Sequence, residues 1–112
     1  MLIEDLIKAV AKFRDERDWK KFHSPKNLAI SLVIEASELL EIFQWTLDNG
    51  FSVVDLKRNE IEEEIADVFI YLLLLVDALN VDLEKAFLKK MKKNEQKYPV
   101  EKVKGKFEHN LL

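Results

Sequence analysis

Apolar residues recur every three or four positions along most of this chain, which is the spacing of one face of an α-helix. The first such pattern predicts a helix over residues 2–18, followed by a short connection. Ser24-Pro25 marks the next helix start, because serine is favoured at the N-cap and proline at the first helical position. This second helix should run over residues 25–47 and end before a turn at Asn49-Gly50.

A third helix is predicted from a cap at Ser52 or Asp55 to about Leu79. Its second half, residues 65–79, is apolar on every side apart from two aspartates. A helix without a solvent-facing side has to be enclosed, and one small bundle can hardly enclose it. We therefore expect this helix to lie at a subunit interface.

The last helix is predicted over residues 83–98, with Asn80 ending the preceding helix and Asp82 as its N-cap. Residues 100–112 show no clear period, so we expect a loop or an arm that rests on a partner. The sequence thus predicts an all-α fold, a four-helix bundle formed by one domain over residues 1–99 and a tail over 100–112.

Composition agrees with this fold class. The 112 residues are 48% hydrophobic and 35% charged and include only two Gly and two Pro, so helix breakers are rare. Absence of cysteine excludes disulfides and thiolate metal sites and fits a cytoplasmic protein. The N-terminus is acidic and amphipathic, unlike a signal peptide. The longest apolar run, residues 68–76, is far shorter than the roughly 20 residues that span a membrane.

Charge is distributed unevenly along the chain. The net charge is −3, yet residues 1–84 carry 9 basic and 18 acidic side chains, whereas residues 85–112 carry nine lysines and three glutamates. Such a basic segment could bind nucleic acid, cover an acidic surface of a neighbouring subunit, or supply lysines to a phosphate ligand. A merely solvated surface is an equally good explanation.

Two pairs of carboxylates stand out: Glu35 with Glu38, and Glu64 with Asp67. Residues three apart project from the same side of a helix, and both pairs fall on apolar stripes that should be buried. Acidic pairs on solvated helix faces are common, but two pairs on buried faces of separate helices favour a site. Packed antiparallel, the helices would bring four carboxylates together, which is costly without a cation. Oxygen ligands of this kind suit Mg²⁺.

Other candidate residues are less specific. Neither histidine, His23 or His109, stands three residues after a glutamate, which disfavours a di-iron carboxylate site. We expect His23 to be part of a connector or of a substrate-pocket wall rather than a catalytic base. Aromatic residues near the ends or faces of the acidic helices either belong to the core or stack against a flat ring: Trp19, Trp45 and Tyr71. Three residues on one face of the last helix could cradle a phosphate, although by themselves they are better explained as solvated surface residues: Lys90, Asn94 and Lys97.

Together these motifs resemble the MazG type of all-α nucleoside triphosphate pyrophosphatase, closest to the single-domain dCTP pyrophosphatase branch, over about residues 3–99. The resemblance rests on Arg17-Asp18-Trp19, Phe22-His23, Pro25-x-Asn27-Leu28, Glu35-x-x-Glu38-Leu39-x-Glu41, Phe43-Gln44-Trp45, Glu64-x-x-Asp67-Val68-x-Ile70-Tyr71-Leu72 and Lys90-Met91-x-x-Asn94-x-x-Lys97-Tyr98-Pro99.

This resemblance implies hydrolysis of a nucleoside triphosphate to the monophosphate and pyrophosphate, in a homodimer or dimer of dimers. It implies Mg²⁺, with Mn²⁺ as a substitute, on Glu35, Glu38, Glu64 and Asp67. A metal-bound carboxylate or Glu41 would take the proton from water. Residues implied to contact substrate are Trp19, His23, Trp45, Tyr71, Lys90, Asn94, Lys97 and Tyr98. Membranes and nucleic-acid polymers are not expected partners.

One position departs from the resemblance. Some members of the dCTP branch carry histidine at position 10, where this chain has Val10. The departure leaves open whether the substrate is dCTP-like, dUTP or a modified or damaged nucleotide. The purpose that the resemblance implies is nucleotide-pool clean-up. The alternative from another class is a non-catalytic helical module that binds a metal or a partner protein.

Overall fold

The computed structural model describes residues 2–106 of the chain. These residues form helices, turns and short connections with no strand among them, which confirms the all-α prediction. The chain divides into two compact units, Met1–Asn80 and Val81–Leu112.

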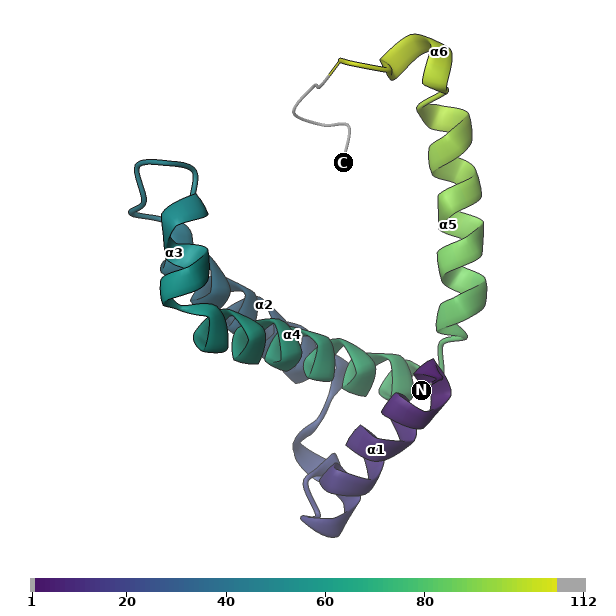
Figure 1. The fold of residues 1–112 in the computed structure, drawn as a ribbon. Coiled ribbons are helices and arrows are strands. Elements are labelled where there is room, and N and C mark those ends of the chain that lie inside the picture. The colour runs from purple at the N-terminus through teal and green to yellow at the C-terminus, as the bar shows by residue number, and fades with distance from the viewer. Residues whose placement is uncertain (1, 107–112) are drawn as a thin grey trace. The chain divides into compact units, whose positions relative to one another are not determined.

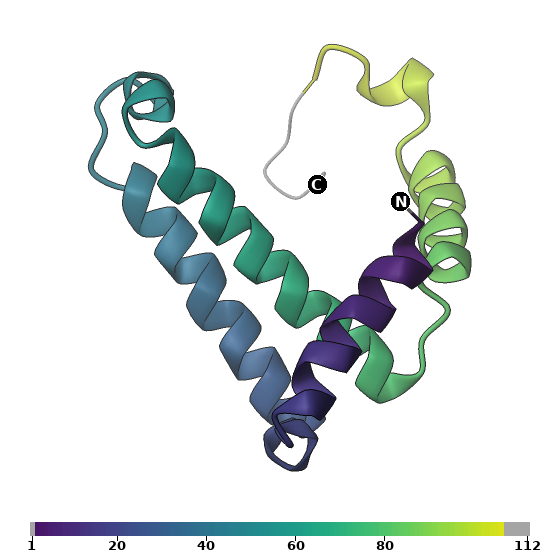
Figure 2. The same ribbon diagram turned by 60° about the horizontal axis from the view of Figure 1, so that its bottom comes forward.

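The first unit is built on a helical hairpin. Its elements are α1 (Ile3–Glu16), the 3₁₀ turn η1 (Lys20–Phe22), α2 (Pro25–Phe43), α3 (Phe51–Leu56) and α4 (Arg58–Leu79). Figures 1 and 2 show α2 and α4 running antiparallel side by side, with α1 crossing the C-terminal part of α4. This arrangement places the predicted acidic faces of α2 and α4 against each other.

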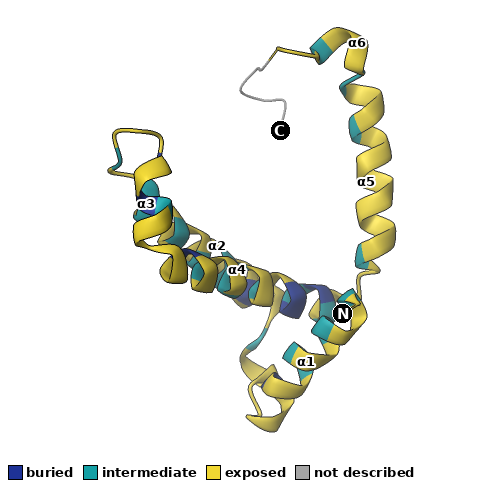
Figure 3. Ribbon diagram, viewed as in Figure 1, coloured by how far each residue is buried: buried dark blue, intermediate teal, exposed yellow. Residues whose placement is uncertain are grey.

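The core lies between these helices. Leu28 on α2 and Leu73 on α4 are almost fully buried, at 1% and 2% exposure. Burying a leucine of this kind contributes about 1.5–3 kcal/mol. Figure 3 shows buried segments in dark blue and partly buried ones in teal along α2 and α4. The apolar stripes on which Glu35 and Glu64 were predicted to lie are therefore the packed faces.

The start of α2 follows the prediction, but its end does not. The Ser24 hydroxyl accepts a hydrogen bond from the Asn27 amide at 3.1 Å, and Pro25 is the first helical residue. The predicted end near residue 47 is wrong, because α2 stops at Phe43. Thr46 ends it by donating both its hydroxyl, at 2.7 Å, and its amide, at 3.1 Å, to the Phe43 carbonyl.

The predicted third helix is in fact two helices. The chain leaves the helical conformation at Lys57 (φ −121°, ψ 31°), between α3 and α4. Neither Ser52 nor Asp55 is the N-cap of α3. That position is held by Gly50, at a left-handed φ of 86°, and the Asp48 carboxylate accepts from the Ser52 amide at 2.9 Å. No proline or glycine marks the break at Lys57, so the hydrophobic pattern could not show it.

The second unit contains α5 (Leu83–Lys97) and α6 (Val100–Val103). Its start confirms the prediction, since Asp82 accepts from the Lys85 amide at 3.0 Å and Asn80 ends α4 in the left-handed conformation. The tail is not all loop, because its first residues form α6. The rest of the predicted tail from residue 107, including His109, lies outside the described residues.

Much of the apolar surface of α4 stays exposed in the single chain. Ile65 and Leu79 are 53% and 52% exposed, and Phe69 is 38% exposed. The chain alone therefore does not enclose this helix. None of the helices over residues 2–106 has both the length and the apolar character needed to cross a membrane.

Candidate active site

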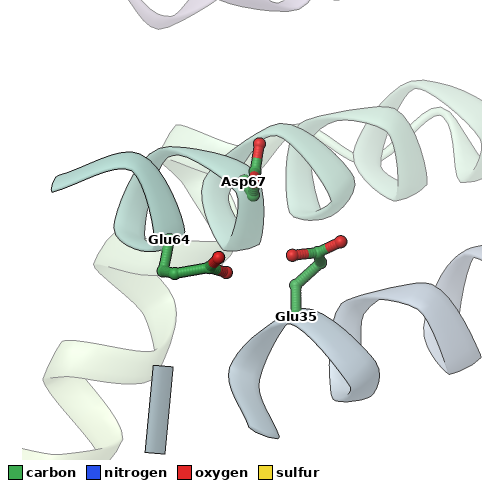
Figure 4. Close-up of side chains that lie close together, drawn as sticks. All are labelled: Glu35, Glu64 and Asp67. Carbon is green, nitrogen blue, oxygen red and sulfur yellow. The ribbon is translucent and has the colours of Figure 1, made fainter. Parts of the chain in front are cut away.

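Three carboxylates converge where α2 and α4 lie side by side. Glu35 comes from α2, and Glu64 and Asp67 come from α4. One carboxylate oxygen of each lies within 4.8 Å of the others, and all three residues are partly buried. In Figure 4 the side chains of Glu35 and Glu64 extend toward each other from the two helices. The helical spacing and the antiparallel packing together produce this cluster.

The cluster is electrostatically unfavourable by itself. The Oε2 atoms of Glu35 and Glu64 are buried and find no hydrogen-bonding partner among the residues that the structure describes. Burial, followed by the nearby Glu38, raises the pKa of Glu35 to about 7. Burial and then the negative charge of Glu38 also raise the pKa of Glu64. An all-oxygen donor set with unsatisfied buried oxygens fits a hard divalent cation.

Glu38 and Glu41 lie beside this cluster rather than within it. Both are exposed, and both line a groove of about 470 Å³ that also contains Glu64. Three of the four predicted ligands thus converge, with Glu38 at the adjoining edge. Lys57 lies in the same groove and was missed by the sequence analysis, because only the break between α3 and α4 places it there.

A separate cavity of about 430 Å³ opens between α1 and α4. Its wall is mostly apolar and includes three aromatic rings, those of Phe13, Trp19 and Tyr71. Asp67 lines the cavity as well, so one residue belongs both to the carboxylate cluster and to the cavity. An aromatic, apolar cavity of this size can hold a flat heterocycle directly beside a cation site.

The two tryptophans predicted to line the substrate pocket lie in different surroundings. Trp19 lines the cavity and is held edge-on against Phe13, with ring centroids 5.8 Å apart and an interplanar angle of 73°. Trp45 follows the end of α2, is 86% exposed, and does not line this cavity. Within one chain, only Trp19 of this pair reaches the site.

His23, predicted to belong to a connector or to a substrate-pocket wall, lines the cavity. Its Nδ1 is buried and has no hydrogen-bonding partner in the described part of the chain. Burial, and secondarily the positive charge of Arg14, lower the pKa of His23. The imidazole is therefore neutral near pH 7 and suited to hydrogen bonding with an uncharged ligand group.

Sequence reasoning missed Arg14 in this cavity wall. Arg14 is 4% exposed and donates from Nη1 to Asp77 Oδ2 at 2.7 Å, which ties α1 to α4. Two signals were present in the sequence: Arg14 stands one helical turn after Val10 on the apolar stripe of α1, and Asp77 interrupts the apolar run of α4. Neither signal reveals that the two residues meet.

The predicted phosphate-binding residues belong to the second unit. Lys90, Asn94 and Lys97 all fall within α5, at spacings that place them on one side of the helix. Tyr98 is its C-cap, and the Lys97 ammonium lies 5.3 Å from the centre of the Tyr98 ring. Their contact with phosphates stays a prediction.

Comparison with known proteins gives consistent results. Residues 30–109 match the model of the MazG-like family. The chain is 42% identical over 106 residues to dCTP pyrophosphatase 1 of Rattus norvegicus, covering 92% of this chain and 62% of the relative. It is 43% identical over 102 residues to dCTP pyrophosphatase 1 of Homo sapiens, covering 87% and 59% respectively. The chain thus spans about three fifths of the length of these relatives.

A solved structure shares the fold. The crystal structure of a pyrophosphatase from Archaeoglobus fulgidus superimposes with a TM-score of 0.81 at 53% sequence identity, covering 86% of this chain and 91% of that one. The matched family model covers most of the chain and includes the three converging carboxylates. The chain therefore belongs to the MazG-like family.

Proposed function

We propose that this protein hydrolyses a nucleoside or deoxynucleoside triphosphate to the monophosphate and pyrophosphate, with a divalent metal ion. The observation that carries the proposal is the position of Asp67, which is shared by a carboxylate cluster and an aromatic cavity. A substrate whose base enters the cavity would have its phosphates near the cluster. The names of the relatives, dCTP pyrophosphatase and pyrophosphatase, support the same reaction.

Glu35, Glu64 and Asp67 would hold the metal ion, with Glu38 as a further ligand from the groove edge. Mg²⁺ is the ion we propose, with Mn²⁺ as a substitute, because carboxylate oxygens suit hard cations. A bound ion of this kind neutralises phosphate charge and lowers the pKa of water. Glu41 lines the same groove as Glu38. It would accept a proton from water if no metal-bound carboxylate does so.

The remaining site residues would bind the substrate. Trp19 and Tyr71 present aromatic surfaces to the cavity, and His23 presents a neutral imidazole. We propose that Lys90, Asn94, Lys97 and Tyr98 contact the phosphates. The base would be that of a dCTP-like or modified deoxynucleotide, and the purpose would be nucleotide-pool clean-up in the cytoplasm.

We also propose that the active form is a homodimer or homotetramer. The support is the apolar surface of α4 that the single chain leaves exposed, including Ile65 and Leu79. Trp45, which is 86% exposed in the single chain, would reach a substrate pocket only in such an assembly.

Product analysis tests the reaction. Purified protein would be incubated with Mg²⁺ and a panel of ribo- and deoxynucleoside triphosphates, beside Glu38→Gln, Glu64→Gln and Glu62→Gln. Glu62 is a matched control, because it lies on α4 but forms only an exposed ion pair with Arg58. Monophosphate plus pyrophosphate, lost in the first two variants and kept in the third, is the expected result. Orthophosphate plus diphosphate would refute the proposed cleavage, and no turnover across the panel would favour the non-catalytic module.

A further inference from the structure

Arg14 is the one arginine or lysine in the wall of the cavity between α1 and α4, within the part of the chain that the structure describes. Its side chain is nearly fully buried, at 5% exposure. Nε donates to Asp15 Oδ1 at 2.9 Å, and Nη1 donates to Asp77 Oδ2 at 2.7 Å. The guanidinium is thus fixed between two carboxylates, one on its own helix and one on α4.

These two bonds leave part of the guanidinium unused. Arginine carries five N–H donors, and Nη2 forms no hydrogen bond with any residue over 2–106. Because Arg14 lines the cavity, a ligand acceptor there would gain a hydrogen bond with a side chain that is already ordered. Because both neighbouring bonds hold the guanidinium in place, little conformational entropy is lost on binding.

The charge around Arg14 selects the kind of acceptor. Two carboxylates within 2.9 Å compensate its positive charge, so an incoming phosphate would meet a region without excess positive charge. A neutral acceptor does not need excess positive charge around it. The cavity wall agrees, since its aromatic rings suit a flat, uncharged ring rather than a phosphate.

We propose that Arg14 determines base specificity, by donating a hydrogen bond from its unused N–H groups to a ring carbonyl of the substrate base. The proposal rests on the proposed function, because it takes the cavity as the base site. It makes Arg14 a specificity-determining residue for bases that present a carbonyl acceptor. Asp15 and Asp77 are then positioning residues that act through the guanidinium.

The test is a pair of ligands with the same shape and different acceptors. Thymidine monophosphate would be compared with the monophosphate of its nonpolar difluorotoluene isostere, which lacks the ring carbonyls. Isothermal titration calorimetry in the presence of a chelator gives both Kd values without any need for turnover. Wild type should bind the carbonyl base about tenfold more tightly, as expected for one well-placed hydrogen bond in a buried site.

Two variants address Arg14 while protecting the fold. Arg14→Lys keeps a charge beside Asp77 but loses the planar fork. The double variant Arg14→Met/Asp77→Leu replaces both partners with apolar groups of similar size, so that no buried charge is left unpaired. Asp77→Asn is the control, because it keeps both the guanidinium and an acceptor. We expect the tenfold ratio to persist in the control and to fall to about one in the double variant.

The possible outcomes separate this inference from the proposed function. An unchanged ratio of the two Kd values in either folded Arg14 variant, or equal Kd values in the wild type, would overturn the inference. Arg14 would then have only the structural role of linking α1 to α4. Loss of inorganic pyrophosphate binding in the double variant would assign Arg14 to phosphate instead. If no triphosphate is hydrolysed but the ratio behaves as expected, the reaction fails and the role of Arg14 in binding the base stands.

Discussion

Glu35 on α2 and Glu64 on α4 extend toward each other, and each has a buried Oε2 with no partner among residues 2–106. A folded chain that holds these groups together without a cation stores unfavourable electrostatic free energy. Metal binding would release it, which links the proposed chemistry to the stability of the fold.

Replacing Glu35 with glutamine should therefore have opposite effects on stability and activity. In the presence of a chelator, Glu35→Gln is expected to raise the melting temperature, because one buried negative charge is removed. Mg²⁺ should raise the melting temperature of the variant much less than that of the wild type. The kcat of the variant should be lower by on the order of 100-fold. Thermal unfolding with and without Mg²⁺, together with a turnover assay, measures both. Equal stabilisation of variant and wild type by Mg²⁺ would remove Glu35 from the metal site.

The raised pKa of Glu35 predicts how stability depends on pH. Its pKa is 4.5 in the ordinary case and about 7 in the folded chain, so the native state binds a proton more tightly than the unfolded state. The contribution of Glu35 to the unfolding free energy of the metal-free protein should then be greatest below about pH 4.5. This contribution should fall as the pH rises toward 7. Urea unfolding at several pH values with a chelator tests this. The dependence of the unfolding free energy on pH should be weaker in Glu35→Gln than in the wild type. An identical dependence in both would contradict the raised pKa of Glu35.

Mg²⁺ binding should show the opposite pH dependence. The metal needs the ionised carboxylate, so its affinity is expected to increase between about pH 6 and 8 as Glu35 loses its proton. Calorimetric titration of Mg²⁺ into the wild type across this range gives the affinity directly. An affinity that stays constant with pH would show that Glu35 does not titrate as the metal binds.

The two tryptophans should respond differently to truncation. Trp45→Ala is expected to raise KM more than it lowers kcat and to leave the unfolding free energy of the single chain nearly unchanged, because Trp45 is 86% exposed. Trp19→Ala should raise KM and also destabilise the fold, since its ring packs against Phe13. Steady-state kinetics and urea unfolding of both variants provide the comparison. An unchanged KM in Trp45→Ala would exclude this side chain from substrate binding.

Gly50 should be the glycine that tolerates substitution least. Its φ is +86°, and an added Cβ would lie 2.7 Å from Cδ1 of Phe43. Gly50→Ala is expected to cost about 1–3 kcal/mol of unfolding free energy. Gly105→Ala is the matched control, because Gly105 has a φ of +75° with open space around the added Cβ. Equal losses in the two variants would show that the backbone conformation alone, and not contact with Phe43, sets the cost.

The sequence by itself determined what depends on neighbours within about one helical turn. The caps at Ser24 and Asp82 are hydrogen bonds over three residues, and the pattern of the chain identified both. The sequence also placed Glu35 and Glu64 on packed helix faces, because helical spacing fixes which face of a helix a residue occupies. Periodicity was therefore sufficient to predict an all-α fold with carboxylates on the packed faces.

Tertiary structure decided the features that depend on contacts between distant segments. Arg14 and Asp77 are 63 positions apart, and only the crossing of α1 over α4 brings them together beside the cavity. The break at Lys57 has no proline or glycine to mark it, and the end of α2 depends on Thr46 folding back onto the Phe43 carbonyl. Hydrophobic periodicity records which face of a helix is buried, but it carries no information about the residue that it is buried against.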